Sequence, residues 1–92
     1  MKIQFSPNFH KKIKKEDVRI QKSFKEALLL FIRNPLDPEF DNHPLREIWK
    51  GYRSIDITGD YRAIYEEVNK GDDVIAYFIT IGTHQELYTR DN

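Results

Sequence analysis

The N-terminal third of the chain begins with a short alternation of polar and apolar residues and then changes to helical spacing. Lys2-Ile3-Gln4-Phe5 alternates, which predicts a short strand. Ser6 followed by Pro7 is typical of a helix start, with serine as the N-cap and proline at the first helical position. A second helix is expected to begin at Glu16-Asp17, where the helix dipole favours acidic residues.

The second predicted helix carries one apolar stripe and ends at Asn34-Pro35. The stripe follows 3/4 spacing and consists of Ile20, Phe24, Ala27, Leu28 and Phe31. We therefore expect a helical hairpin that covers an apolar sheet, with Phe24, Leu28 and Phe31 in the core. Residues 35–47 contain three prolines and several acidic residues, so they are expected to form an ordered loop.

From residue 48 onward the pattern indicates antiparallel strands. Three are predicted, over residues 48–57, 61–68 and 73–81, with turns at Thr58-Gly59-Asp60 and at residues 69–72. The last strand is apolar on both faces, which favours an interior position in the sheet. Thr83 and Glu86 fit a capping box that opens a short helical turn. The predicted fold class is α+β, one domain over residues 1–92 with the order β-α-α-β-β-β and a twisted antiparallel sheet.

Composition limits the class of protein. A chain of 92 residues with 39% apolar and 13% aromatic residues can bury one compact core, to which we assign Trp49 as well. Without cysteine, neither disulfides nor thiolate metal sites are possible. No His/Asp cluster has ligand-like spacing, so no metal and no cofactor are expected. No apolar run reaches membrane-spanning length and no signal peptide is recognisable, so we expect a soluble cytoplasmic protein without a membrane partner.

Charge is distributed unevenly although the formal net charge is zero. Residues 1–33 hold nine Lys/Arg against three Asp/Glu, whereas residues 34–92 hold six against twelve. This asymmetry predicts a basic face that would help to hold phosphates. The alternative is a solvated, lysine-rich helix; His10 lies among these lysines and is given no role.

Four short strings carry a family resemblance. They are His43-Pro44-Leu45, Trp49-Lys50-Gly51-Tyr52-Arg53, Gly59-Asp60-Tyr61-Arg62 and Gly82-Thr83-His84. In their order and spacing they resemble the RelE/ParE superfamily of bacterial toxins, and within it the YafQ-like mRNA interferases. The resemblance covers nearly the whole chain. It implies a helical hairpin on one face of the sheet, an RNA site on the other, concave face, cleavage of mRNA in the ribosomal A site, and restraint by a cognate antitoxin protein.

Metal-free RNA cleavage has definite chemical requirements. The 2′-hydroxyl is the nucleophile, a base must deprotonate it, and an acid must protonate the leaving 5′-oxygen. Cationic groups must support the extra charge on the phosphate in the transition state. Histidine suits the acid and base roles because it titrates near neutral pH.

The resemblance implies roles for individual residues. His84 corresponds to a catalytic histidine and His43 to a second histidine of the site, although each also fits a role in local hydrogen bonding or packing. Asp60 matches an aspartate that acts as base or orients a histidine, but aspartate after glycine is also ordinary turn chemistry. Tyr61 and Tyr88 stand where the branch carries Trp and Phe. They would stack on RNA or serve the chemistry, or else lie at the edge of the core.

Two positions depart from the branch. Asp56 stands where a histidine is expected, and Thr80 where a catalytic arginine is expected. Arg62 lines up with an arginine of the RelE branch and is the predicted substitute, because arginine binds phosphate in a two-pronged geometry. Its alternative role is an ion pair with Glu66 or with a neighbouring strand. Arg53 and Lys50 are the predicted RNA-binding residues, with a structural role beside Tyr52 as the alternative for Arg53.

Three functional hypotheses follow. The first is a toxin of a type II toxin–antitoxin system that cleaves mRNA on the ribosome. The second, motivated by Asp56 and Thr80, is a weakened or inactive protein of the same fold that binds an antitoxin or the ribosome. The third is a ParE-like gyrase inhibitor, against which the His/Asp/Tyr set argues because gyrase inhibition needs no such residues.

Overall fold

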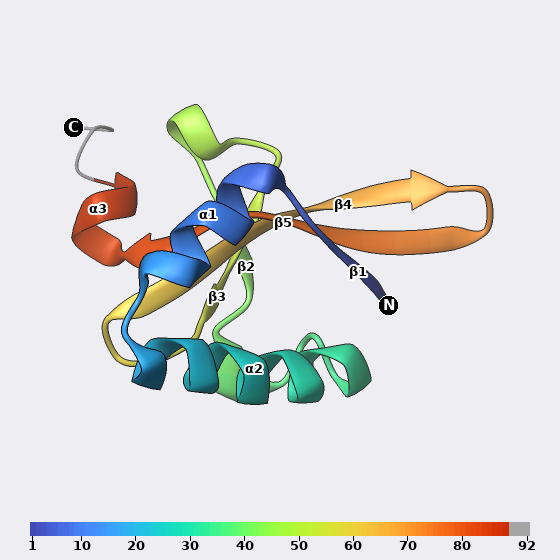
Figure 1. Cartoon of the computed structure of the whole chain (residues 1–92). Coiled ribbons are helices and arrows are strands. Elements are labelled where there is room, and N and C mark those ends of the chain that lie inside the picture. Colours follow the sequence, from blue (N-terminus) through green and yellow to red (C-terminus); the bar gives the residue numbers. More distant parts are fainter. Residues whose placement is uncertain (89–92) are drawn as a thin grey trace.

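The computed structural model describes residues 1–88 and contains a five-stranded sheet (Figure 1). The strands are β1 (Lys2–Phe5), β2 (His43–Pro44), β3 (Arg53–Asp56), β4 (Tyr61–Lys70) and β5 (Asp73–Thr83). They are arranged in the order β1-β5-β4-β3-β2, so β5 is an interior strand as predicted. The α+β fold class is confirmed.

The sheet is mixed, which corrects the prediction that it is entirely antiparallel. β1 runs parallel to β5, with Gln4 opposite Tyr77, whereas all other neighbouring strands are antiparallel. The backbone N–H of Ser6 extends this pairing with a 2.9 Å hydrogen bond to the carbonyl oxygen of Phe78. A parallel neighbour is possible because β1 is joined to the other strands by two helices, not by a tight hairpin.

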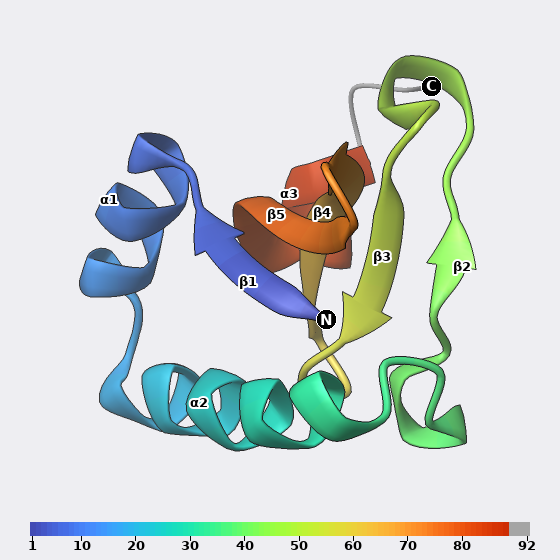
Figure 2. The same ribbon diagram turned by 90° about the vertical axis from the view of Figure 1, so that its right-hand side faces the viewer.

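Both predicted helices form; the N-cap predicted at Ser6 is confirmed, and the second helix begins at the predicted acidic residues, with Asp17 as its N-cap. Helix α1 (Pro7–Lys15) begins where the Ser6 side chain accepts a hydrogen bond from the Phe9 N–H. Helix α2 (Val18–Arg33) begins at Asp17, whose carboxylate accepts from the Arg19 N–H. The helices diverge from their junction, so the predicted hairpin is widely open (Figure 2).

The core lies between these helices and one face of the sheet. Phe24 and Phe31 are buried as predicted, and Leu28 packs against them at the edge of the cluster. Aromatic rings dominate the core: the Phe78 ring centroid lies 5.7 Å from that of Phe24 and 5.5 Å from that of Phe31. Tyr65 completes the cluster at 5.2 Å from Phe31. This aromatic layer determines which face of β4 and β5 points away from the helices.

The predicted strand over residues 48–57 is wrong in its first half. Residues Glu47–Trp49 form the 3-10 helix η2. Gly51 follows with a φ of +96°, which glycine adopts readily and which is incompatible with a continuous strand. Trp49 is therefore not in the core as predicted. Its indole N–H instead donates a 2.9 Å hydrogen bond to the carbonyl of Leu87. Residues 35–47, predicted as an ordered loop, contain two short regular elements, the 3-10 helix η1 (Pro38–Phe40) and strand β2.

The predicted capping box opens the last helix, α3 (His84–Tyr88). The Thr83 N–H donates to Glu86 Oε1 at 2.9 Å, and the Glu86 N–H donates to Thr83 Oγ1 at 3.1 Å. Leu87 anchors α3 against Gly82, on the face of β5 opposite the core. Within residues 1–88, none of the helices has both the length and the apolar character needed to cross a membrane.

Candidate functional site

Four predicted site residues meet in one hollow on the sheet face that points away from α2. Neighbouring β4 residues alternate between the two faces, so Ala63 is buried in the core while Arg62 faces the opposite side. The hollow has a volume of about 290 Å³. Its walls are formed by Asp41, His43, Leu45, Arg62, His84 and Tyr88.

His43 enters the hollow from β2, the short edge strand that pairs with β3. Its Nδ1 lies 2.6 Å from the carbonyl oxygen of Asp41, and the Asp41 carboxylate is 3.8 Å away. A carbonyl oxygen only accepts hydrogen bonds, so Nδ1 carries the hydrogen. In the neutral ring Nε2 is then the proton acceptor, which leaves one basic nitrogen for a substrate.

His84 and Tyr88 enter from α3, one helical turn apart. Their rings contact each other edge to face, with centroids 4.6 Å apart. The Tyr88 hydroxyl is 3.2 Å from Ser54 Oγ on β3, and the His84 backbone N–H donates to the Asp60 carbonyl at 3.2 Å. The hydrogen bond from the Thr83 N–H lowers the pKa of Glu86, so the capping box that places His84 holds a charged carboxylate.

Arg62 forms an ion pair with a neighbouring strand, which was one of the alternatives for this residue. Its Nε lies 3.2 Å from Asp56 Oδ1, and the two residues are paired in register across β3 and β4. The alternative pairing with Glu66 is not observed among the contacts of residues 1–88. Arg62 still lines the hollow together with the two histidines.

Tyr61 points to the other side of the sheet. Its ring packs against the core, and its hydroxyl donates a 2.9 Å hydrogen bond to Glu16, which raises the pKa of Tyr61. The structure therefore does not place this tyrosine for stacking in the hollow. Asp60 reaches the site through its backbone, because its carbonyl oxygen accepts from His84 while its exposed side chain does not line the hollow.

Arg53 and Lys50 also lie away from the hollow. Arg53 is paired in register with Tyr65, on the core-facing side of the sheet, and its Nε donates to Asn42 Oδ1 at 2.8 Å. This contact matches the structural alternative for Arg53. Lys50 is exposed at the end of η2.

Thr80 lies in a different hollow, on the other side of α3. It is buried beside Trp49 and Leu87 in a space of about 650 Å³ that also reaches Lys12 on α1. Lys12 approaches the same strand: a Cβ built on Gly82 would lie 3.2 Å from its Nζ. Neither Lys12 nor Asp41 was predicted as a site residue from the sequence. For Asp41, its position two residues before His43 was the feature that could have indicated it.

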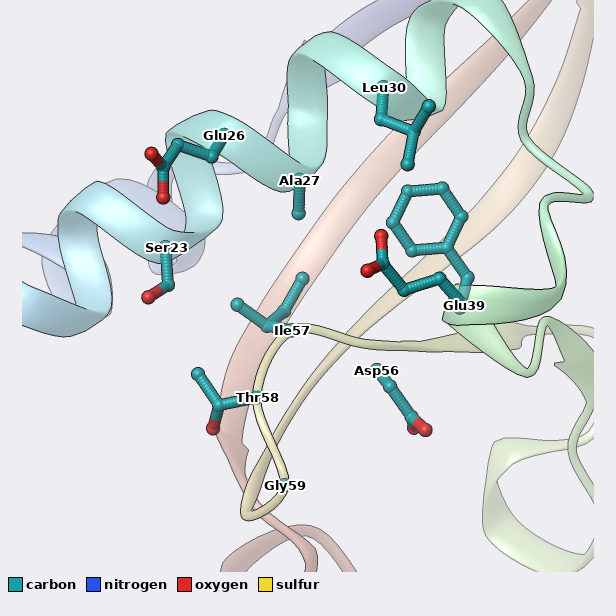
Figure 3. A pocket seen from close by; sticks show the side chains of 10 residues that line it. Ser23, Glu26, Ala27, Leu30, Glu39, Asp56, Ile57, Thr58 and Gly59 are labelled. Carbon is teal, nitrogen blue, oxygen red and sulfur yellow. The ribbon is translucent and has the colours of Figure 1, made fainter.

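A further hollow lies between α2 and the turn after β3 (Figure 3). It measures about 460 Å³, and its charged side chains are the carboxylates Glu26, Glu39 and Asp56. A hollow lined by carboxylates repels a polyanion. None of the predicted catalytic residues lines it, so the hollow with His43 and His84 is the candidate site.

Comparisons of the sequence and of the structure with known proteins point to the same family. Residues 1–89 match the family model described as "Bacterial toxin of type II toxin-antitoxin system, YafQ". The chain is 32% identical to "mRNA interferase toxin YafQ" of Escherichia coli strain B / BL21-DE3, over 94% of each chain. The crystal structure of YafQ from E. coli BL21(DE3) superimposes with a TM-score of 0.76 at 31% identity, covering 94% of this chain and 96% of that one.

A solved complex adds a partner for one of these relatives. The E. coli DinJ–YafQ complex contains a chain similar to this one, with a TM-score of 0.65, 31% identity, and coverage of 94% of this chain and 96% of that one. The match to the family model spans nearly all of the sequence, and the fold agrees with it. This chain belongs to the YafQ family of bacterial toxins of type II toxin–antitoxin systems.

Proposed function

We propose that this protein is an mRNA interferase: a ribosome-dependent, metal-free endoribonuclease held in check by a cognate antitoxin. The observation that carries the proposal is the meeting of His43, Arg62, His84 and Tyr88 in one hollow. These residues come from three separate parts of the chain, and together they supply the acid, base and cation that the reaction needs. The names of the curated relatives support the same activity.

The two histidines carry the proton transfers in this proposal. One imidazole removes the proton of the 2′-hydroxyl, whose oxygen attacks the adjacent phosphorus. The other donates a proton to the 5′-oxygen as the P–O bond to it breaks, which leaves a 2′,3′-cyclic phosphate and a free 5′-hydroxyl. Nδ1 of His43 is engaged by the Asp41 carbonyl, so Nε2 is its reactive nitrogen.

The remaining residues bind or orient. Arg62 donates hydrogen bonds to the phosphate oxygens as charge builds up on them. Tyr88 supports the His84 ring, and the Asp60 carbonyl fixes the start of α3. Contacts of Lys50 and Arg53 with RNA would lie outside the hollow, on nucleotides that flank the cleaved bond. Thr80, in its separate hollow, has no part in the reaction.

The partner and the location follow from the same proposal. Chains similar to this one are found in the DinJ–YafQ complexes, which supports a cognate antitoxin protein as partner. The substrate is mRNA in the ribosomal A site, so the protein acts in the cytoplasm.

Induced expression of the protein without its antitoxin tests the proposal. Translation should stop, and primer extension should detect new 5′ ends in ribosome-bound mRNA. His84→Ala and His43→Ala should each lower the cleavage rate by about 10²- to 10⁴-fold, the usual contribution of a general acid or base. His10→Ala is the matched control, because His10 lies on α1 beside Phe5 and should leave the rate unchanged.

The proposal fails if the wild-type protein leaves ribosome-bound mRNA intact at every level of expression. It fails equally if His84→Ala and His10→Ala behave alike, because the hollow would then not be the site of the chemistry.

A further inference from the structure

The Asp56–Arg62 ion pair joins β3 to β4 beside the candidate site: Arg62 lines the candidate hollow, whereas Asp56 lines the neighbouring hollow of Figure 3. Asp56 ends β3 and stands opposite Arg62 in the β3–β4 register. Nε and Oδ1 are 3.2 Å apart, and the side chains are only 22% exposed for Arg62 and 30% exposed for Asp56. A pair that is mostly buried is screened much less by salt than a surface pair. The attraction of the carboxylate therefore helps to fix the position of the guanidinium.

On its other flank Arg62 has a strand neighbour without a side chain, and the space above that neighbour is occupied by Lys12, Glu86 and Leu87. On β5 the residue in register with Arg62 is Gly82. A Cβ there would lie 3.3 Å from Leu87 Cδ2 and 3.2 Å from Lys12 Nζ, so a larger residue would disturb the packing of α3. Of the two residues in register with Arg62, only Asp56 therefore has a side chain that can fix the guanidinium. A long arginine side chain loses considerable rotamer entropy when held in one orientation, and this carboxylate holds it.

The pair has hydrogen-bonding capacity that residues 1–88 do not use. Arg62 Nη1 and Asp56 Oδ1 are both closed off from solvent, and neither has a hydrogen-bond partner among the described residues. Buried donors in folded proteins are nearly always satisfied, so each exception calls for an explanation. A ligand with anionic oxygens in the hollow that Arg62 lines would accept the hydrogen bond that Nη1 lacks, whereas Oδ1, itself an acceptor, faces Arg62 Nε.

We propose that Asp56 is a positioning residue that aims Arg62 at one phosphate of the RNA. The carboxylate holds the Nε end of the guanidinium, and the remaining donors bind a non-bridging oxygen of the phosphodiester. This inference rests on the proposed function for the identity of the anion. It also gives Asp56 a use that differs from that of the histidine expected at this position.

Binding of a non-cleavable RNA separates this role from the chemistry. The probe is a short fluorescent RNA with 2′-O-methyl groups throughout, measured by polarisation against the wild type, Asp56→Ala, Arg62→Ala and the double variant. Asp56→Ala should weaken binding about 10- to 100-fold, by analogy with the loss on removing a partner that orients a metal ligand. In the Arg62→Ala background the same change should have no further effect, because Asp56 acts through Arg62.

Two further variants sharpen the experiment. Asp56→Glu keeps the charge and should restore part of the affinity. Asp73→Ala removes a carboxylate that pairs with Lys2 at 2.8 Å on the distant β1–β5 edge, and it should bind like the wild type. Circular dichroism of every variant shows whether a loss of binding reflects a loss of fold.

Equal effects of Asp56→Ala in both backgrounds would overturn the inference, because a purely structural role is additive. Tighter binding by Asp56→Ala would overturn it too, since the carboxylate would then only repel the phosphate. Absence of any Arg62-dependent binding has the same consequence. If the wild type cleaves no mRNA but the binding cycle is non-additive, the proposed function fails while this inference stands.

Discussion

Tyr88 shows how one side chain serves two contacts in the candidate site. Its ring supports His84, with centroids 4.6 Å apart, and its hydroxyl reaches Ser54 at 3.2 Å. The two contacts are expected to contribute differently to stability and to the site. A hydrogen bond of this kind contributes about 0.5–1.5 kcal/mol to stability, whereas the ring forms part of the wall of the hollow. We therefore predict that the ring, more than the hydroxyl, is the part of Tyr88 on which activity depends.

Substitution at position 88 tests this division. Tyr88→Phe keeps the ring and should reduce the cleavage rate by no more than a few-fold, with a loss of about 1 kcal/mol in the free energy of unfolding. Tyr88→Ala removes the support of the His84 ring and should lower the rate by about 10²-fold, the cost of misplacing a catalytic group by about 1 Å. Single-turnover cleavage and urea unfolding measure the two effects. Equal rates for both variants would contradict a role for the ring.

At the scale of elements, α3 depends on its capping box more than on its length. Five residues are too few for a helix that is stable alone. The reciprocal hydrogen bonds between Thr83 and Glu86 and the packing of buried Leu87 hold it on the sheet. Since His84 is the first residue of α3, the position of a proposed catalytic group is tied to the state of this box.

The capping box predicts a pH dependence with a definite sign. The Thr83 N–H lowers the pKa of Glu86 in the folded state below its ordinary value of 4.5. A lowered folded-state pKa contributes stability that is present above the unfolded-state value and is lost as pH falls through the folded-state value. We therefore expect α3 to loosen below about pH 4.5, seen as smaller protection factors at the amides of residues 86–88, that is, exchange rates corrected for the intrinsic effect of pH on exchange.

Glu86→Gln is the matched variant for this prediction. Glutamine also fits a capping box but does not titrate, so the protection factors of α3 in Glu86→Gln should not change with pH in this range. An unchanged pH profile in the variant would mean that another group controls the helix.

At the scale of the whole molecule, the basic and the acidic parts of the sequence lie in different places. The lysine-rich helix α1 lies along β5, and Lys12 extends to Gly82 beside α3. Helix α2 covers the face of the sheet that points away from the candidate site, beside the hollow of Figure 3 with its three carboxylates. Of the two helices, α1 is therefore the one whose lysines lie nearer to the proposed site, and we expect a long RNA to meet them before it meets α2.

Charge reversal on the two helices tests this arrangement. Lys14→Glu with Lys15→Glu on α1 should raise the KM for ribosome-bound mRNA and leave kcat nearly unchanged, because these exposed lysines lie outside the hollow. The effect should shrink as salt is added. Lys22→Glu with Lys25→Glu on α2 makes the same change in charge and should raise KM less. Equal effects of the two pairs would indicate attraction by net charge alone.

Local signals in the sequence were enough for most of the elements. The N-caps at Ser6 and Asp17 and the box at Thr83 and Glu86 act through neighbours within three residues, so the chain itself specifies them. The apolar stripe that includes Phe24 and Phe31 likewise predicted the buried face of α2. The family resemblance led to His43, Arg62, His84 and Tyr88, which the fold does bring into one hollow.

Only the tertiary structure decided which sheet face each remaining residue uses and which strands are neighbours. The parallel pairing of β1 with β5 joins segments some 70 residues apart, and no local pattern reports it. Tyr61 and Arg62 are adjacent in sequence, yet the pleat turns one toward the core and the other into the hollow. Asp56, which in the sequence is only a departure from a family pattern, becomes the partner of Arg62 because register places the two opposite each other.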